Sequence, residues 1–232
     1  MKNSLLRALS WVLRYAGLPL LLVTSLAQAH LDSTVPVVRL VDGGLTRAEF
    51  TQTIKIFEAV FASYAARENR TFEILSDWNE SWPQAFARRW ETDHLVVYGG
   101  IARIPGSTVD SFALTLCHEV GHLYGGEPFG DEHNRMAVEG QADYWAASEC
   151  WEKIIYELPL RVGSVQDRGV AAAIVLTAFF AANRNLPSPR VETPDTSIAE
   201  RINRTHPMPQ CRLDTYLAGL ELSERPLCWW AP

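Results

Sequence analysis

The stretch Leu114–Gly126, LTLCHEVGHLYGG, places the strongest constraint on the fold of this chain. At about 100° per residue, its apolar and polar side chains fall on opposite sides of a helix. One side carries Phe112, Ala113, Leu116, Val120 and Leu123, and the other carries Ser111, Thr115, His118 and His122. Possible capping and first-turn residues precede the stretch (Ser107, Thr108, Asp110), and Gly125-Gly126 can end it. The pattern predicts a helix that buries the first side and presents the second to a cleft.

The centre of this helix reads His118-Glu119-Val120-Gly121-His122. Two histidines four residues apart share a helical face and can bind one metal ion, with Glu119 beside them. A zinc hydrolase needs two such imidazoles, a third protein ligand, and a water whose pKa the metal lowers to about 7. Glu119 is then the acceptor of that water's proton. The pentapeptide also occurs by chance on surface helices, but the two-sided pattern favours the functional interpretation.

A second helix, predicted from about Met136 to Tyr156, carries Glu139-Gly140-Gln141-Ala142-Asp143. Glu139 and Asp143 share a face, so Glu139 can supply the third metal ligand and Asp143 can accept a hydrogen bond from a ligating imidazole. The small residues Gly140 and Ala142 allow the two helices to approach closely. The alternative is a pair of solvated acids on a surface helix, but the position seventeen residues after His122 favours the metal site.

HEVGH followed by EGQAD resembles the HExxH and ExxxD motifs of the gluzincin zinc metallopeptidases. The form is similar to the branch that contains the CAAX prenyl endopeptidases and the periplasmic quality-control proteases. Residues 84–87, Gln-Ala-Phe-Ala, resemble that branch's Asn-Ala-Phe-Ala strand, and the likeness covers roughly residues 82–150. The resemblance implies zinc ligands at His118, His122 and Glu139. It also implies Glu119 as general base and Asp143 as the residue that orients a ligand. The chain departs from the membrane members by lacking their transmembrane helices, and from most relatives by its cysteines.

The N-terminus has the pattern of a secretory signal. Lys2, Arg7 and Arg14 precede the apolar run Tyr15–Leu26, and Ala27-Gln28-Ala29 matches a signal-peptidase site. An uncleaved anchor is the alternative, but the run is shorter than the ~20 residues of a membrane-spanning helix. We therefore expect residues 1–29 to be removed, leaving one metallopeptidase domain at 30–232 in the periplasm or outside the cell. His30, then N-terminal, could hold copper, but no second set of ligands accompanies it.

Charge and cysteine content narrow the class of protein further. The segment 1–29 has three positive and no acidic residues, so its removal changes the formal net charge from −6 to −9. Such an acidic chain has no electrostatic footprint for nucleic acid or anionic lipid, and we expect no stable membrane insertion after signal removal. The even number of cysteines in an exported chain predicts two disulfides among Cys117, Cys150, Cys211 and Cys228. Their pairing stays open.

The predicted fold is a single α+β, zincin-like domain, mostly helical with a small sheet. Thr46-Arg47-Ala48-Glu49 has the form of a capping box that opens a helix to about Arg67. The predicted strands are Val35–Val41, Thr71–Leu75, Trp82–Ala87 and His94–Tyr98, the last two joined through Glu91-Thr92-Asp93. An edge strand ahead of the metal helix can rim the active-site cleft and pair with an extended peptide. The alternative is an ordinary hairpin.

The C-terminal third holds one candidate for chemistry. Val170–Ala182 is predicted to be a buried helix, 187–194 a proline-rich loop and Ile198–Asn203 a short helix. Thr205-His206-Pro207 resembles the Thr-His-Pro element of the same branch. His206 is therefore a candidate donor to the oxyanion of a tetrahedral intermediate. Arg212 is a weaker candidate, and a structural polar contact is an equal alternative for either residue. His94 and His133 are predicted to lie outside the site.

These patterns together predict an exported zinc endopeptidase that acts on peptide or protein substrates. A non-hydrolytic module that assists assembly of the cell envelope, with or without a stabilising metal, is the alternative. The variant Glu119→Gln separates the two, because it should retain zinc and lose only hydrolysis.

Overall fold

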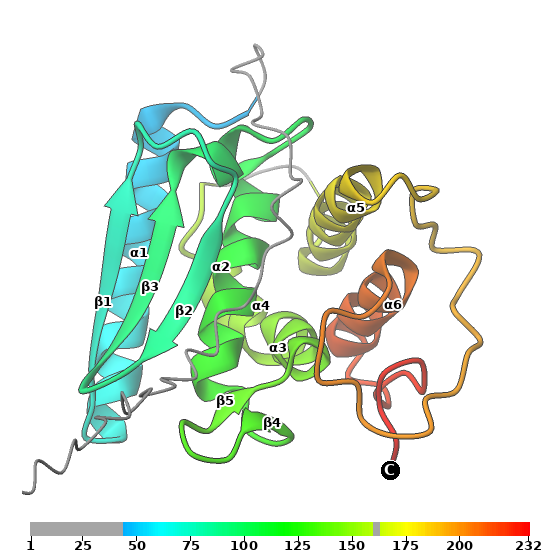
Figure 1. Cartoon of the computed structure of the whole chain (residues 1–232). Helices are drawn as coiled ribbons and strands as arrows, with labels where there is room; N and C mark the ends of the chain where they lie inside the picture. Colours follow the sequence, from blue (N-terminus) through cyan, green and yellow to red (C-terminus); the bar gives the residue numbers. More distant parts are fainter. Residues whose placement is uncertain (1–43, 160–162) are drawn as a thin grey trace, which may run out of the picture. The chain divides into compact units, whose positions relative to one another are not determined.

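The computed structural model describes residues 44–159 and 163–232. The predicted signal sequence, His30 and the strand predicted at Val35–Val41 lie outside the described residues. The helices are α1 (Arg47–Arg67), α2 (Val109–Tyr124), α3 (Glu139–Trp145), α4 (Trp151–Ile155), α5 (Val165–Asn183) and α6 (Pro209–Leu220). The strands are β1 (Thr71–Asp77), β2 (Ala85–Arg89), β3 (Thr92–Tyr98), β4 (Phe129–Asp131) and β5 (Met136–Ala137). A 3₁₀ turn, η1 (Gly99–Arg103), follows β3, and a π turn, η2 (Ala146–Cys150), joins α3 to α4. The α+β class predicted from the sequence is confirmed (Figure 1).

Helix α1 forms as its sequence predicts. The Thr46 hydroxyl accepts the backbone N–H of Glu49, and the Glu49 carboxylate accepts the backbone N–H of Thr46, completing the capping box. Phe50, Phe57 and Phe61 recur at helical spacing on its inner side and are almost completely buried. This aromatic stripe is therefore core.

The larger sheet has the strand order β1-β3-β2, with β1 and β3 parallel and β2 antiparallel to β3. It lies over α1 and α2 (Figure 1). Among the described strands, β2 pairs only with β3, so its other side is a free edge. Gln84 and Trp90, at the two ends of β2, both hydrogen-bond to the β3 side. By alternation, the backbone groups of Ala85, Ala87 and Arg89 point away from β3 toward the free edge.

Asp93 corrects the predicted boundary between the two antiparallel strands. The sequence placed it in the connecting turn, but β2 extends to Arg89 and β3 begins at Thr92. The Asp93 side chain is fully buried, with Arg70 donating at 2.6 and 2.8 Å and Arg89 at 3.2 and 3.4 Å. The Tyr124 hydroxyl adds a hydrogen bond at 3.1 Å. One carboxylate thus ties the sheet to the end of α2.

Helix α2 begins after Thr108, whose hydroxyl accepts the backbone N–H of Ser111 in a capping box. The side that carries His118 and His122 was predicted to face a cleft, and His122 is the partly exposed residue on it. Every α2 residue except His122 is buried, because α3, α5, η2 and the sheet all pack against this helix. The metal-binding pattern therefore lies on a central helix of the core.

The second predicted helix begins at Glu139 rather than at Met136. Met136 and Ala137 instead form β5, which pairs with β4, and the Val138 N–H donates to Pro128. Those bonds hold the backbone extended until Glu139. After Trp145 the π turn η2 interrupts the helix before α4.

The C-terminal third differs most from expectation. The predicted apolar helix is present as α5, which by length and composition alone could cross a membrane but packs against α2 and α6. The helix predicted at Ile198–Asn203 is wrong: this stretch is irregular, and the N–H groups of Ala199 and Asn203 donate to carbonyls of the C-terminal segment. Helix α6 was not predicted.

Two disulfides are present, as the cysteine count predicted. Cys117–Cys150 joins α2 to η2, and Cys211–Cys228 joins α6 to the C-terminal segment. The described part of the chain has no free cysteine. The pairing that the sequence left open is thereby settled.

Candidate metal centre

His118 and His122 direct the same ring nitrogen to one place. The Nε2 atoms of the two rings lie 3.2 Å apart. The other nitrogen of each ring has a separate partner: His118 Nδ1 lies 2.7 Å from an Asp143 oxygen, and His122 Nδ1 lies 2.8 Å from the Ala137 carbonyl oxygen. Acceptors at both Nδ1 atoms favour the tautomer in which Nδ1 carries the proton. Both Nε2 lone pairs are then available to a metal.

Glu139 completes the candidate ligand set. Its carboxylate oxygens lie 3.3 Å from His118 Nε2 and 3.6 Å from His122 Nε2. A tetrahedral ion bound at about 2.0–2.1 Å holds its ligands about 3.3 Å apart, so these distances fit a single ion. The Glu139 Oε2 atom is buried, and within residues 44–159 and 163–232 it has no hydrogen-bond partner. A buried carboxylate oxygen without a donor is costly, and a bound cation would satisfy it.

Two glycines near the centre lie in close contacts, but only one of them lies between α2 and α3. A Cβ at Gly121 of α2 would stand 2.7 Å from the Ala142 carbonyl oxygen in α3, so Gly121 and Ala142 set the close approach of the two helices. Gly140 was predicted to share that role. Instead it faces Trp229, whose ring would lie 2.2 Å from an added Cβ.

Behind the centre, Asp143 links His118 to Arg212. Arg212 donates two hydrogen bonds of 2.7 Å to the carboxylate, and its side chain is 2% exposed. Burial alone would raise the pKa of Asp143, but the charges of Arg212 and His118 and their hydrogen bonds lower it to about 2. Arg212 therefore supports Asp143, with both of these bonds directed to its carboxylate.

Glu119 lies at the junction of α2 and β2. Its carboxylate accepts a hydrogen bond from the Ala87 N–H, one of the groups on the free edge of β2. The residue is 8% exposed, and burial raises its pKa to about 7. His118, Glu119 and His122 each offer a ligand atom within 4.8 Å of the others. For the third ligand we favour Glu139 over Glu119, because Glu119 is held by the strand and Glu139 has an unsatisfied oxygen.

His206 joins this group from a loop far away in sequence. Its Nε2 lies 3.2 Å from Glu139 Oε1, and its side chain is 33% exposed, more than that of His118, His122 or Glu139. Burial lowers the pKa of His206 to about 4, against the opposing charge of Glu139. The ring is therefore neutral near pH 7 and can donate one N–H.

The electrostatic potential at the centre is negative. Burial would lower the pKa of His118, yet Asp143 and Glu139 raise it to about 10. The pKa of Glu139 lies well below its ordinary value, although burial opposes the shift, because His122 and His118 stabilise the carboxylate. A negative potential that favours a proton between the imidazoles and the Glu139 carboxylate also favours a divalent cation there.

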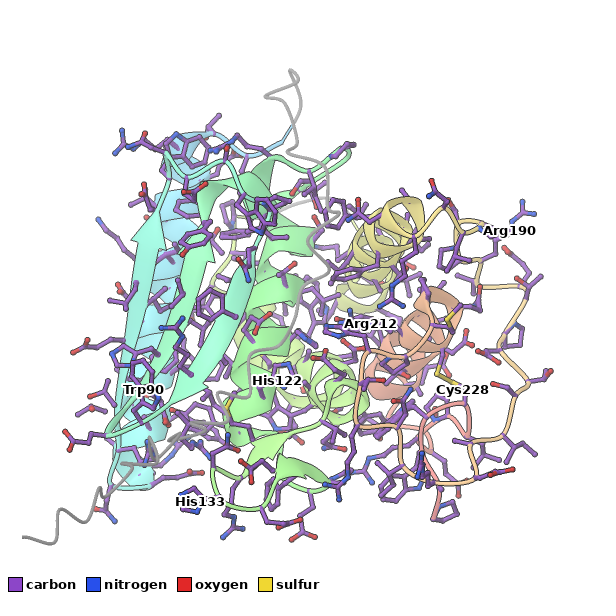
Figure 2. The ribbon with its side chains drawn as sticks, viewed as in Figure 1. Trp90, His122, His133, Arg190, Arg212 and Cys228 are labelled. Carbon is purple, nitrogen blue, oxygen red and sulfur yellow. A yellow bond between two sulfur atoms is a disulfide. The ribbon has the colours of Figure 1, made fainter. Side chains whose placement is uncertain are left out.

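The remaining candidates lie elsewhere. His94 lies 3.6 Å from Glu73 on the sheet, and His133 is exposed near β4 and β5, apart from His122 in Figure 2. A cavity of about 350 Å³ between the start of α2 and α5 is lined by none of the residues of the metal centre. Asp195, Cys211 and Cys228 also lie together, but the two cysteines are joined as a disulfide.

Sequence reasoning missed several contacts of the centre, including the pairing of Arg212 with Asp143. Gly121 was visible inside the motif, and its spacing against Ala142 was the available signal. Residues 84–87 were predicted to belong to a strand that can rim the cleft. The bond of the Ala87 N–H to Glu119 and the packing of Trp229 on Gly140 gave no local signal, because these contacts join distant parts of the chain. Comparisons with family models, with curated proteins and with solved structures found no match for this chain.

Proposed function

We propose that this chain is an exported, zinc-dependent endopeptidase. The observation that carries the proposal is the meeting of His118 Nε2, His122 Nε2 and the Glu139 carboxylate. The two nitrogens lie 3.2 Å apart, and the carboxylate oxygens lie 3.3 Å from the first and 3.6 Å from the second, distances that suit one tetrahedral ion. These three residues would hold the zinc. When bound, the metal supplies a Lewis acid that polarises a peptide carbonyl and lowers the pKa of water.

The chain's own residues supply the remaining chemistry. Glu119 accepts a proton from water as the water oxygen bonds to the peptide carbon, and it passes that proton to the nitrogen as the C–N bond breaks. The neutral His206 ring donates a hydrogen bond to the oxygen that becomes negative. The His118–Asp143–Arg212 chain keeps the first imidazole in its orientation.

The free edge of β2 suits an extended peptide as substrate. The backbone groups of Ala85 and Arg89 point toward that edge, and Ala87 between them contacts Glu119. A peptide that adds a strand there would carry its main chain past the general base. Main-chain pairing gives affinity with little dependence on side chains, which favours a protease over an enzyme specific for a small molecule.

Export is supported by the two disulfides, which form and persist in oxidising compartments. Each adjoins a residue of the centre, Cys117 beside His118 and Cys211 beside Arg212. The N-terminal pattern of a cleaved signal agrees with this location.

Glu119→Gln tests the proposal. Native mass spectrometry should find one zinc per chain in both the wild type and the variant, while cleavage of an unfolded protein substrate falls at least 10³-fold in the variant. Glu127→Gln, at an exposed position close to the same motif, is the matched control and should cleave like the wild type. A folded wild type that binds no divalent metal contradicts the proposal. A variant with undiminished biological function favours the non-hydrolytic envelope module instead.

A further inference from the structure

The C-terminal segment, residues 221–232, packs beside Glu139 through residues that have no role in the proposed reaction. Cys228 is bonded to Cys211 of α6. The next residue, Trp229, is fully buried and packs with Val138 and Cys211 in a small apolar cluster separate from the main core. Its ring covers Gly140, the neighbour of Glu139. Figure 2 shows Cys228 and Arg212 on the same side of the centre as α6.

The same segment supports the loop that carries His206. The Ala199 N–H donates to the Leu227 carbonyl at 2.8 Å, and the Asn203 N–H donates to the Trp229 carbonyl at 2.9 Å. The Asn203 side-chain oxygen accepts two hydrogen bonds from Thr205, from its N–H at 2.9 Å and from its hydroxyl at 2.8 Å. Thr205 precedes His206, so a chain of contacts runs from the disulfide to the imidazole beside Glu139.

The loop between α5 and α6, residues 184–208, has no helix or strand of its own. Its first half is anchored to α6, through Arg190 to Gln210 and through Asp195 to Asp214. Near His206 the remaining contacts are longer: Arg204 to the Gly130 carbonyl at 3.3 Å and Arg184 to the Pro207 carbonyl at 3.5 Å. The short hydrogen bonds close to His206 therefore come from Asn203 and the C-terminal segment.

We infer that Asn203 and Trp229 are positioning residues for His206, and that the Cys211–Cys228 disulfide is the covalent clasp that keeps them in place. The clasp acts on the loop and not on the metal ligands, because His118, His122 and Glu139 come from α2 and α3. The contact of Gly121 with Ala142 and the bond of His118 to Asp143 hold these two helices together. Loss of the clasp should therefore reduce the turnover that depends on His206 and leave metal binding unchanged. The role of His206 rests on the proposed function, whereas the placement of the loop does not.

The kinetic test is a double-mutant cycle between the clasp and His206. Removal of one oxyanion donor costs about 10²–10³-fold in kcat, and we expect His206→Ala to lie in that range. The double variant Cys211→Ser/Cys228→Ser should lower kcat by about 10–10²-fold, as misplacement by about 1 Å does, with zinc content and KM unchanged. In the His206→Ala background the serine pair should cause no further loss. An equal loss in both backgrounds overturns the clasp.

Asn203 keeps the inference testable if the serine pair does not fold, because its variants leave the disulfide intact. Asn203→Ala should lower kcat about 10-fold, and Asn203→Asp, which retains the acceptor for Thr205, should restore most of it. A loss of equal size in the alanine and aspartate variants contradicts the positioning role.

A measurement without catalysis separates this inference from the proposed function. Hydrogen exchange of the zinc-loaded protein, followed by mass spectrometry, should be faster over residues 199–206 in the serine pair and unchanged over α2. Unchanged exchange over 199–206 overturns the clasp even if the enzyme is active. Faster exchange in a protein whose wild type cleaves no peptide upholds the clasp and refutes the endopeptidase.

Discussion

Gly121 of α2 lies directly against the backbone of Ala142 in α3, and a Cβ on Gly121 would stand 2.7 Å from the Ala142 carbonyl oxygen. The contact is backbone to backbone, so no side chain can rotate away to make room. It fixes the separation between the helix that carries both histidines and the helix that carries Glu139. The geometry of the candidate metal centre is thus set at a position that has no side chain.

Gly121→Ala should push the two helices apart. We expect a loss of about 1–3 kcal/mol in the free energy of unfolding from overpacking, and weaker zinc binding in a chelator competition. Gly130→Ala is the matched control, because an added Cβ there meets nothing nearer than 3.7 Å. Zinc affinity that is equal in the two variants would show that the helix separation does not govern the centre.

Asp143→Asn should weaken metal binding, because Asp143 orients the His118 ring. The amide is a poorer acceptor for His118 Nδ1, and loss of such a partner costs about 10–100-fold in metal affinity. The variant also leaves the buried Arg212 charge unpaired, which destabilises a fold by about 3–5 kcal/mol.

Asp110→Asn controls for that second effect. Asp110 forms another buried bidentate pair, with Arg168 at 2.8 and 2.9 Å, and it is not among the residues of the centre. It should reduce stability and leave zinc affinity unchanged, as measured by chelator titration. A comparable drop in affinity for both variants would mean that general loosening, and not the Asp143–His118 bond, is responsible.

Ala85→Pro tests the free edge of β2. Proline removes an N–H that points away from β3, so the ladder to β3 keeps its bonds while a peptide substrate loses one donor. We expect KM for a peptide to rise about 5–10-fold, equivalent to one net hydrogen bond, with little change in kcat. Ala85→Ser retains the N–H and should behave like the wild type. Unchanged KM in the proline variant would exclude strand addition at this residue.

The contribution of Asp93 to the stability of the fold should decrease as the pH falls below about 4. Burial would raise its pKa, but hydrogen bonds from Arg70 and Arg89 lower it below the ordinary value. A depressed folded-state pKa gives stability that is present above the unfolded pKa of about 3.9 and is lost as pH falls through the folded value. Asp93→Asn should therefore cost about 3 kcal/mol at pH 7 and clearly less at pH 3. Urea unfolding at both pH values measures the difference; an equal cost at both excludes the ionised carboxylate as the source.

The sequence predicted well those parts whose signals are local. Helices α1 and α2, the shared face of Glu139 and Asp143, and the presence of two disulfides each follow from caps, periodicity or counts within a short window. Partners far apart in sequence were not predictable in this way. Asp93 looks like a turn residue until Arg70 and Arg89 surround it, and Gly140 looks like a helix–helix contact until Trp229, 89 positions later in the sequence, fills the space.

The wrong helix at residues 198–203 and the unpredicted helix α6 have a related cause. Residues 198–203 have helix-compatible composition, but their backbone donors are taken by the carbonyls of the C-terminal segment. Such competition between local and distant partners is invisible in a short window. The sequence likewise gave no partner for Arg212, because only packing of α6 against α3 brings it to Asp143.

The parts of the centre are spread along the chain from Ala87 to Trp229, and this has a consequence for biosynthesis. When the ribosome has made the residues up to Glu139, both histidines and the carboxylate exist, but the arginine that balances Asp143 and the tryptophan that covers Gly140 have not been made. A nascent polypeptide therefore cannot complete this site before Trp229 has been made. A product that stops before Leu227 should therefore lack the carbonyls to which Ala199 and Asn203 of the His206 loop donate.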